Sequence, residues 1–204
     1  MTDQSVCIIL YSMSEVSQSP GLQHRILETA SRLFYEQGYH ATGINQIISE
    51  AQVAKASFYH HYASKEILCV AYLHKRKYDW MRRLYKHVDQ YNKPKRRVLA
   101  LFDFLEEWIK SVHYRGCAFL NILSEFPVSD GIIREEVKIQ KTALRDYIYS
   151  LVETAMTDKI IEKDILQRAN LVYLLFEGAI VESQNFRDLW PIQTARDSMR
   201  DLIA

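Results

Sequence analysis

Residues 42–68 read TGINQIISEAQVAKASFYHHYASKEIL, and this stretch decides how the N-terminal part of the chain folds. Apolar residues recur at helical spacing in two short segments, 44–51 and 55–62. Phe58 and Tyr62 lie four residues apart, so both face one side of the second segment. Helices this short are not stable alone. The stretch therefore predicts two short helices joined by a tight turn and packed against a preceding helix.

The rest of the chain is also predicted to be helical. Glycine and proline are scarce, at 6 and 4 of 204 residues, and apolar positions recur every three or four residues. We therefore expect an all-α protein of about nine helices. They run from Ser19, as N-cap, to near Gly38, and then over residues 44–51, 55–62, 64–91, 92–116, 117–125, 131–156, 163–184 and 194–203.

Two of the long helices have predicted inward faces. The cleanest apolar stripe lies within 131–156 and consists of Ile133, Val137, Gln140, Leu144, Ile148, Leu151 and Ala155. In the helix that Ser64 caps, the apolar positions include Ile67, Ala71, Tyr78, Met81, Tyr85 and Val88. We expect both sets to face the core.

The formal net charge of +1 hides an uneven distribution. Residues 21–97 hold 14 Lys and Arg against 6 Asp and Glu, whereas residues 98–204 hold 12 against 17. A basic first part and an acidic second part indicate two functions, and the basic part is suited to binding a polyanion. Residues 21–66 alone have four of each sign, so the excess lies in 67–97, where a solvated helix face explains it equally well.

Composition disfavours several other classes of protein. No apolar run approaches the roughly 18 residues that a membrane span requires, and the short run 6–11 has no basic region before it, as a signal peptide would. Cys7, Cys69 and Cys117 are odd in number and widely spaced, which fits neither a disulfide framework nor a zinc knuckle. We expect a cytoplasmic protein with no metal and no cofactor.

The segment 55–62 carries side chains suited to nucleic acid. When two short helices are joined by a tight turn, the second can enter the major groove of DNA. Small residues at its N-terminal end allow close approach, and its polar groups suit phosphates and base edges. The candidates are Lys55, Ala56, Ser57, Tyr59 and His60. Lys65 begins the next helix, where free backbone N–H groups add to the attraction for a phosphate.

A wider pattern of residues surrounds this segment. It comprises Gly38-Tyr39, Thr42, Ile47, Glu50-Ala51, Val53, Lys55, Ser57 to Tyr62, Ser64-Lys65-Glu66 and Leu68. In order, spacing and residue type, residues 22–68 thereby resemble the N-terminal domain of the TetR family of regulators. The resemblance implies a dimer that binds a palindromic DNA operator and represses transcription until a small-molecule effector binds its C-terminal domain. It places at the DNA Thr42, Lys55, Ser57, Tyr59, His60 and Lys65.

Two positions depart from the family's pattern. Gln52 stands where the family usually has a glycine in the turn, and Ala54 stands where it often has a capping serine or threonine. A residue with a Cβ in a left-handed turn conformation costs about 1 kcal/mol, and loss of a cap costs about as much. We expect these changes to affect operator affinity and not the fold. Thr42 is expected to cap the helix over 44–51 as well as to contact a phosphate.

The C-terminal part holds the candidate effector and dimer residues. Residues that either line a cavity or form plain core are Phe102, Trp108, Phe119, Asn121, Phe126, Tyr147, Tyr173, Phe176 and Glu177. Their aromatic bias favours an apolar or planar effector. Residues 171–181 are apolar nearly all round a helix, which requires cover on both sides, and we expect a second subunit to supply one cover. The residues predicted at that interface are Leu171, Leu174, Leu175, Gly178, Ile180 and Val181.

We therefore predict a flexible lead over 1–19, with translation starting at Met1 or Met13, a DNA-binding domain over 20–66, and an effector-binding and dimerisation domain over 67–204. No catalytic residues are expected, because the sequence has no GxSxG, no HExxH and no phosphate loop. Two alternatives to a ligand-responsive repressor stay open. One is an activator of the same type, and the other is an all-α small-molecule-binding protein that retains the two short helices as scaffold.

Overall fold

The computed structural model describes residues 21–126, 131–156 and 161–203, and within these ranges it contains nine helices and no strand. The prediction of an all-α fold is confirmed. The helices are α1 (Leu22–Glu36), α2 (Ile44–Glu50), α3 (Lys55–His61), α4 (Lys65–Asp89), α5 (Pro94–Ser111), α6 (Ala118–Ser124), α7 (Ile132–Ala155), α8 (Glu162–Phe186) and α9 (Trp190–Leu202). Both Met1 and Met13, and the predicted lead over 1–19, lie outside the described residues.

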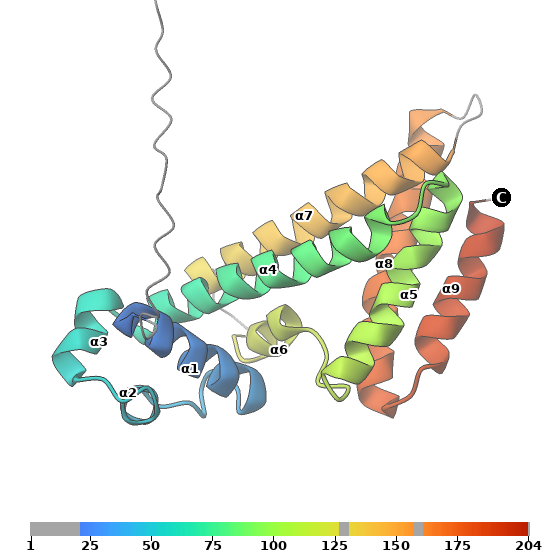
Figure 1. Ribbon diagram of the computed structural model, residues 1–204. Helices are drawn as coiled ribbons and strands as arrows, with labels where there is room; N and C mark the ends of the chain where they lie inside the picture. Colours follow the sequence, from blue (N-terminus) through green and yellow to red (C-terminus); the bar gives the residue numbers. More distant parts are fainter. Residues whose placement is uncertain (1–20, 127–130, 157–160, 204) are drawn as a thin grey trace, which may run out of the picture.

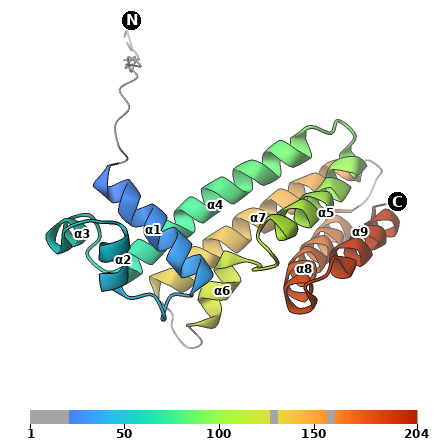
Figure 2. The same cartoon turned by 60° about the horizontal axis from the view of Figure 1, so that its bottom comes forward.

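The helices form two groups that α4 joins. In Figures 1 and 2, α1, α2 and α3 gather at one end of the molecule, and α5, α8 and α9 gather at the other. Helix α4 has 25 residues and is therefore about 37 Å long. It runs beside α7, while α8 packs against α7 and α9. None of the described helices is both long and apolar enough to cross a membrane.

Several predicted helix ends are confirmed, and others are corrected. The Ser64 hydroxyl accepts a hydrogen bond of 3.1 Å from the backbone N–H of Ile67, as expected of an N-cap, and Pro94 opens α5. Helix α1 begins at Leu22 with Gly21 as its N-cap, so the start expected from Ser19 is wrong. Ser19 itself lies outside the described residues.

Helix α5 ends at Ser111, five residues before the predicted stop at Gly116. His113 and Tyr114 both adopt left-handed backbone angles, with φ of 51° and 59°, and this conformation cannot continue a right-handed helix. Helix α9 begins at Trp190, four residues earlier than predicted. Sequence periodicity located these helices but did not fix their ends.

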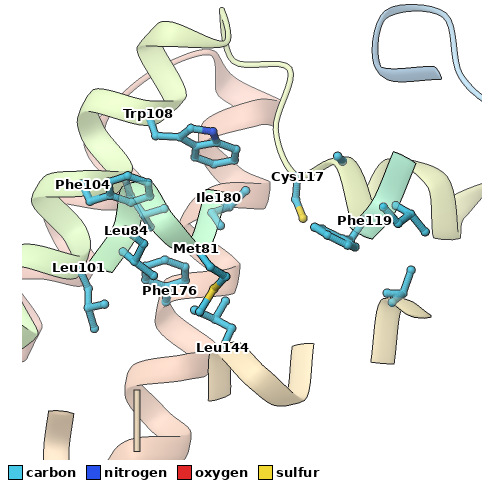
Figure 3. Packing of buried hydrophobic residues seen from close by; sticks show 14 of the residues in the cluster. Met81, Leu84, Leu101, Phe104, Trp108, Cys117, Phe119, Leu144, Phe176 and Ile180 are labelled. Atoms are coloured by element: carbon cyan, nitrogen blue, oxygen red, sulfur yellow. The ribbon is translucent and has the colours of Figure 1, made fainter. Parts of the chain in front are cut away.

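The predicted inward face of α7 is confirmed, whereas that of α4 is partly wrong. All seven residues of the α7 stripe are buried. On α4, Ile67, Tyr78 and Tyr85 are 45%, 68% and 38% exposed, and other residues face the core: Leu68, Cys69, Tyr72, Leu73 and Leu84. Helix α4 contacts α1, α5, α6 and α7, and its buried residues shift round the helix between Leu68–Leu73 and Met81–Val88, so they follow no single stripe. Figure 3 shows Met81 and Leu84 in the core with Leu101, Phe104 and Phe176.

Candidate nucleic-acid interface and effector cavity

Helices α2 and α3 are held in place by buried side chains. Ile47 on α2 and Phe58 on α3 are fully buried, and Tyr62 just after α3 is 4% exposed. Both helices lie beside α1 in Figure 2. The inward direction predicted for Phe58 and Tyr62 is therefore confirmed, and it fixes which side of α3 faces solvent.

The turn between α2 and α3 has the strain that its sequence predicts. Gln52 adopts φ of 53°, the left-handed conformation that glycine accepts without cost. Ala54 is the N-cap of α3 with an extended backbone, and it has no polar side chain to bond the free N–H groups of the first turn. Gln52 therefore occupies the left-handed position of the turn, and Ala54 occupies the N-cap position of α3, as the sequence predicts.

The outer face of α3 presents the predicted contact residues together. Lys55, Ala56, Tyr59 and His60 are exposed, and Ser57 is half-buried. Tyr59 is 43% exposed although its ring is large and mostly apolar. Its neighbour Phe58 is buried, so of these two adjacent aromatic side chains one packs in the core and the other faces solvent. An exposed face with a cation, a phenol and an imidazole can bond phosphates and base edges.

Two further predicted contacts, Thr42 and Lys65, are less exposed than Lys55 and Tyr59. Thr42 is fully buried, and its hydroxyl donates a hydrogen bond of 2.6 Å to the carbonyl of Gly38. Gly43 is the N-cap of α2, so the capping role expected for Thr42 is wrong, and burial keeps its hydroxyl from a phosphate in this structure. Lys65 is half-buried with its Nζ 4.2 Å from the centre of the Tyr39 ring, and burial lowers its pKa.

A cavity of about 360 Å³ lies between α1 and the helices α4, α5, α6, α7 and α8. Its apolar walls include Trp80, Trp108, Phe119, Leu144 and Ile180, and a volume of this size suits a small organic molecule. In Figure 3, Cys117 and Phe119 lie on one side and Trp108 and Ile180 lie on the other. Because α1 supplies Ser31 and Tyr35 to the wall, the cavity touches the helix against which α2 and α3 pack.

Three of the nine predicted effector residues line this cavity, namely Trp108, Phe119 and Glu177. Phe102 and Phe176 do not, because both are fully buried and pack against each other with ring centroids 5.9 Å apart. They are plain core, the alternative that residue type alone leaves open.

The other four predicted residues also lie outside the cavity wall. The Asn121 amide donates to the Arg115 carbonyl over 3.0 Å. The Phe126 ring packs on Tyr39, with centroids 4.9 Å apart, and the Tyr147 ring packs on Tyr85 at 4.6 Å. Tyr173 is half-buried and is not part of the wall. For these residues the predicted cavity position is wrong.

Sequence reasoning missed most of the polar residues of the wall, among them Ser31, Gln140 and Lys141, and it also missed Trp80. One signal was available, because Gln140 is the polar member of the otherwise apolar α7 stripe. The Lys141 ammonium lies 2.5 Å from the Glu177 carboxylate and 3.6 Å from the Cys117 sulfur. Burial by itself lowers the pKa of Lys141, but the neighbouring Cys117 and Glu177 outweigh it, so the pKa is raised.

Helix α6 connects the cavity to the end of the molecule that α1, α2 and α3 form. Its N-terminal residues line the cavity, and Glu125 at its C-cap binds the turn after α1. The Glu125 carboxylate accepts hydrogen bonds from the backbone N–H groups of Tyr39 and His40, at 2.8 and 2.7 Å. Gly38 has φ of 98°, and a Cβ there would lie 2.8 Å from Glu125 Oε1, so the close approach requires glycine.

Two family models match the chain. Residues 26–72 match the model described as bacterial regulatory proteins, tetR family, and residues 94–199 match the Tetracyclin repressor-like C-terminal domain. The second match alone spans more than half of the chain. The chain belongs to the TetR family. It is accordingly a helix-turn-helix transcriptional regulator that binds DNA, as the sequence predicted.

Individual relatives agree with the TetR assignment. The HTH-type transcriptional repressor DhaR of Mycobacterium sp. (strain GP1) is 25% identical over 181 residues, which cover 87% of this chain and 89% of DhaR. The HTH-type transcriptional activator FasR of Mycolicibacterium smegmatis is 29% identical over 132 residues, which cover 63% of this chain and 57% of FasR. The crystal structure of SCO4454, a TetR-family regulator from Streptomyces coelicolor, superposes with a TM-score of 0.80 at 25% identity, covering 91% of this chain and 90% of that one.

In this TetR-family chain, exposed apolar side chains gather on α8 and at the start of α9. Leu171, Leu174 and Val181 are 39%, 63% and 37% exposed, and they lie on one side of α8 together with exposed Gly178. Phe186 and Trp190 continue the apolar surface where α8 passes into α9. Leu175 is half-buried. Ile180 is 2% exposed and lines the cavity, so its predicted place at a dimer interface is wrong.

Proposed function

We propose that this protein is a ligand-responsive repressor that binds a palindromic operator as a homodimer in the cytoplasm, with no cofactor. The observation that carries the proposal is the outer face of α3, where Lys55, Tyr59 and His60 are exposed together on a helix whose opposite face is buried. In a helix-turn-helix protein such a face enters the major groove. The membership of the TetR family supports the same role.

The homodimer rests on the apolar face of α8. Leu174 is 63% exposed, and a row of exposed apolar residues on one helix is characteristic of a protein interface. A Cβ at Gly178 would meet nothing within 4 Å inside the subunit, so the glycine leaves room for a partner helix to approach. Two α3 helices related by twofold symmetry would then read half-sites about one helical turn apart.

The ligand response rests on the position of the cavity. Its wall includes α1 and α6, and Glu125 at the end of α6 binds the turn that leads into α2. A molecule that fills the cavity in only one arrangement of these helices stabilises that arrangement and shifts the population away from the DNA-binding one. The difference in affinity for the two arrangements sets how far the ligand shifts the equilibrium.

Binding assays with matched variants test the DNA-binding role. DNA selected from a random pool should contain a palindrome, and fluorescence anisotropy should show that Tyr59→Ala and Lys55→Ala weaken its binding. The controls are Tyr78→Ala on α4 and Lys163→Ala on α8, which remove the same side-chain types from exposed positions. Equal affinity of all four variants would contradict the assigned surface and favour the alternative that the two short helices are only scaffold.

Light scattering tests the dimer. Leu174→Lys should give monomers and lose palindrome binding, because it places a charge in the apolar face. Ile139→Lys, at a 51% exposed position on α7, should leave the dimer intact. A dimer that survives Leu174→Lys would contradict this interface.

A reporter assay distinguishes repression from activation. FasR is named an activator and DhaR a repressor, so both directions of control occur among relatives. For a repressor, deletion of the gene should raise expression from a promoter that contains the selected palindrome. A fall in expression would identify an activator.

A further inference from the structure

The cavity wall contains two arginines, Arg76 and Arg83, that have no carboxylate partner. Every carboxylate of the wall is paired with another cation: Glu28 and Asp79 with Lys75, Glu36 with Arg32, and Glu177 with Lys141. Neither Arg76 nor Arg83 forms an ion pair with any of the described residues. The ion pairs of the wall therefore leave two guanidinium groups that an anion can bind.

Both arginines remain accessible on one side of α4. They are seven residues apart, which is almost two helical turns, so their side chains leave the helix in nearly the same direction. Arg83 is exposed and Arg76 is half-buried. Every Arg76 nitrogen that lacks a hydrogen-bond partner is open to solvent. A molecule in the cavity can therefore reach N–H donors of both residues.

The Arg76 guanidinium is held in place by an aromatic ring. Its Cζ lies 4.0 Å from the centre of the Tyr35 ring, so a cation–π contact fixes the group and no carboxylate takes part. The five N–H donors of a guanidinium form a planar fork, and two of them match the two oxygens of a carboxylate. Arg76 is thus positioned to bind a carboxylate in this geometry.

The wall next to the two arginines is apolar. Trp80 lies one helical turn after Arg76 on α4, and the two side chains are therefore neighbours. Trp80 and Val112 are half-buried, and both line the cavity. A bare inorganic anion would leave this apolar surface in contact with water, whereas an apolar body attached to the anionic group would cover it. The cavity volume of about 360 Å³ is in the range of sites for small organic molecules.

Tyr35 connects this site to the rest of the molecule. Its hydroxyl donates a hydrogen bond of 2.9 Å to the Gly116 carbonyl, in the segment before α6. Arg115 Nε donates a bond of 3.0 Å to the Tyr35 carbonyl. Tyr35 is part of α1, against which α2 and α3 pack. An anion that draws Arg76 away from the Tyr35 ring would therefore change a contact of α1.

We propose that the effector of this regulator is an organic carboxylate with a small apolar body, and that Arg76 and Arg83 bind its carboxylate. The inference rests on the proposed ligand response and names the chemical class of its ligand. The apolar wall would accept an uncharged molecule of the same shape equally well. The two arginines without carboxylate partners are what select for the anion.

Two probes of nearly equal shape test this selection by isothermal titration calorimetry on the full-length protein. They are 2-naphthoate, an anion at neutral pH, and 2-naphthamide, which is uncharged. We expect 2-naphthoate to bind about tenfold more tightly, the difference that one hydrogen bond to a charged group makes. Added sodium chloride should weaken the binding of 2-naphthoate and leave that of 2-naphthamide unchanged, because salt screens charge.

Variants of the two arginines assign the preference to this site. Arg76→Gln and Arg83→Gln should each reduce the tenfold preference for 2-naphthoate. Arg82→Gln removes the same charge from an exposed position on α4 that does not line the cavity, and it should keep the preference. Arg76 contacts Tyr35, so its variant can fail to fold; Arg83 is exposed, and its variant then carries the test. Equal binding of the two probes to the parent protein, no saturable binding of 2-naphthoate, or an unchanged preference in Arg83→Gln would each overturn the inference.

Anisotropy with the selected palindrome, measured alongside, keeps the two proposals apart. Loss of DNA binding on addition of 2-naphthoate, at a higher concentration for Arg83→Gln than for Arg82→Gln, supports both. Selective binding of 2-naphthoate that leaves DNA affinity unchanged would overturn the ligand response and leave the ligand preference of the cavity standing. Loss of DNA binding with 2-naphthamide but not with 2-naphthoate would overturn the proposed class and leave the response standing.

Discussion

Replacing Gln52 with glycine should stabilise the protein. Gln52 adopts φ of 53° in the turn after α2, and its side chain is exposed. This left-handed conformation costs a residue with a Cβ about 1 to 2 kcal/mol, and glycine avoids the cost. Glycine also makes the unfolded chain more flexible, which offsets about 0.4 to 1 kcal/mol. The balance is a gain of up to about 1.6 kcal/mol in the free energy of unfolding, with a central value of about 0.8 kcal/mol.

Gln90→Gly is the matched control. Gln90 is also an exposed glutamine at the end of a helix, but its φ is −67°, so glycine relieves no strain there. Its amide donates a hydrogen bond of 2.8 Å to the His87 carbonyl, which the substitution also removes. Gln90→Gly should lower the free energy of unfolding by about 0.5 to 1 kcal/mol. The two substitutions share their chemistry and should have opposite signs.

Urea denaturation of both variants at one protein concentration measures the two changes, since association would otherwise add to stability. The slope of unfolding free energy against urea should match that of the parent. If Gln52→Gly lowers the midpoint as Gln90→Gly does, the turn stores no strain and the reasoning fails.

Three further predictions concern the cap of α3, the α6 contact and a buried thiol. Ala54→Ser should raise the free energy of unfolding by about 1 kcal/mol in the same assay, because the hydroxyl can cap α3. Glu125→Ala should lower the free energy of unfolding by about 2 kcal/mol, whereas Glu135→Ala, in an exposed pair with Lys138, should leave it unchanged. Burial raises the pKa of Cys69 from 9.0 to about 12, so this group favours folding below pH 9 and loses that contribution as the pH rises towards 12. Stability should fall over that range, and Cys69→Ala should make the fall shallower.

The contrast between α7 and α4 shows what sequence periodicity can predict. Helix α7 packs one face on neighbours along its whole length, so one stripe describes it, and all seven predicted residues are buried. The buried residues of α4 shift round the helix between Leu68–Leu73 and Met81–Val88, so no single stripe describes it. Tyr78 has helical spacing with Met81 and Tyr85, yet it is 68% exposed. Which neighbour covers a face is a property of the tertiary structure.

The face of α3 and the cavity also differ in how far the sequence could predict them. The face of α3 was predictable because seven consecutive residues form it, and local geometry alone separates Phe58 from Tyr59. The cavity is built from six helices, so residue type could indicate Trp108 and Phe119 but could not distinguish them from Phe102 in the core. Trp80 was missed because it enters the wall from α4, where the predicted face was wrong.

The basic excess of residues 67–97 lies away from the face of α3. Lys75, Arg76 and Arg83 line the cavity. Arg96 and Arg97 pair with Asp103 and Asp89. These contacts favour the explanation of the excess as solvated and paired helix faces over a surface for a polyanion.

The number of cations near the α3 face leads to a last prediction, which rests on the proposed dimer. Each subunit brings Lys55 and the half-buried Lys65 to this region, which makes four lysines in a dimer. Each phosphate contact contributes about −0.9 to the slope of log affinity against log salt concentration, so the slope should be about −4. Anisotropy titrations at several salt concentrations measure it. A slope near −8 would mean that basic residues beyond α3 also bind phosphates, and substitution of Lys75 or Arg83 would then reduce the slope where we expect no change.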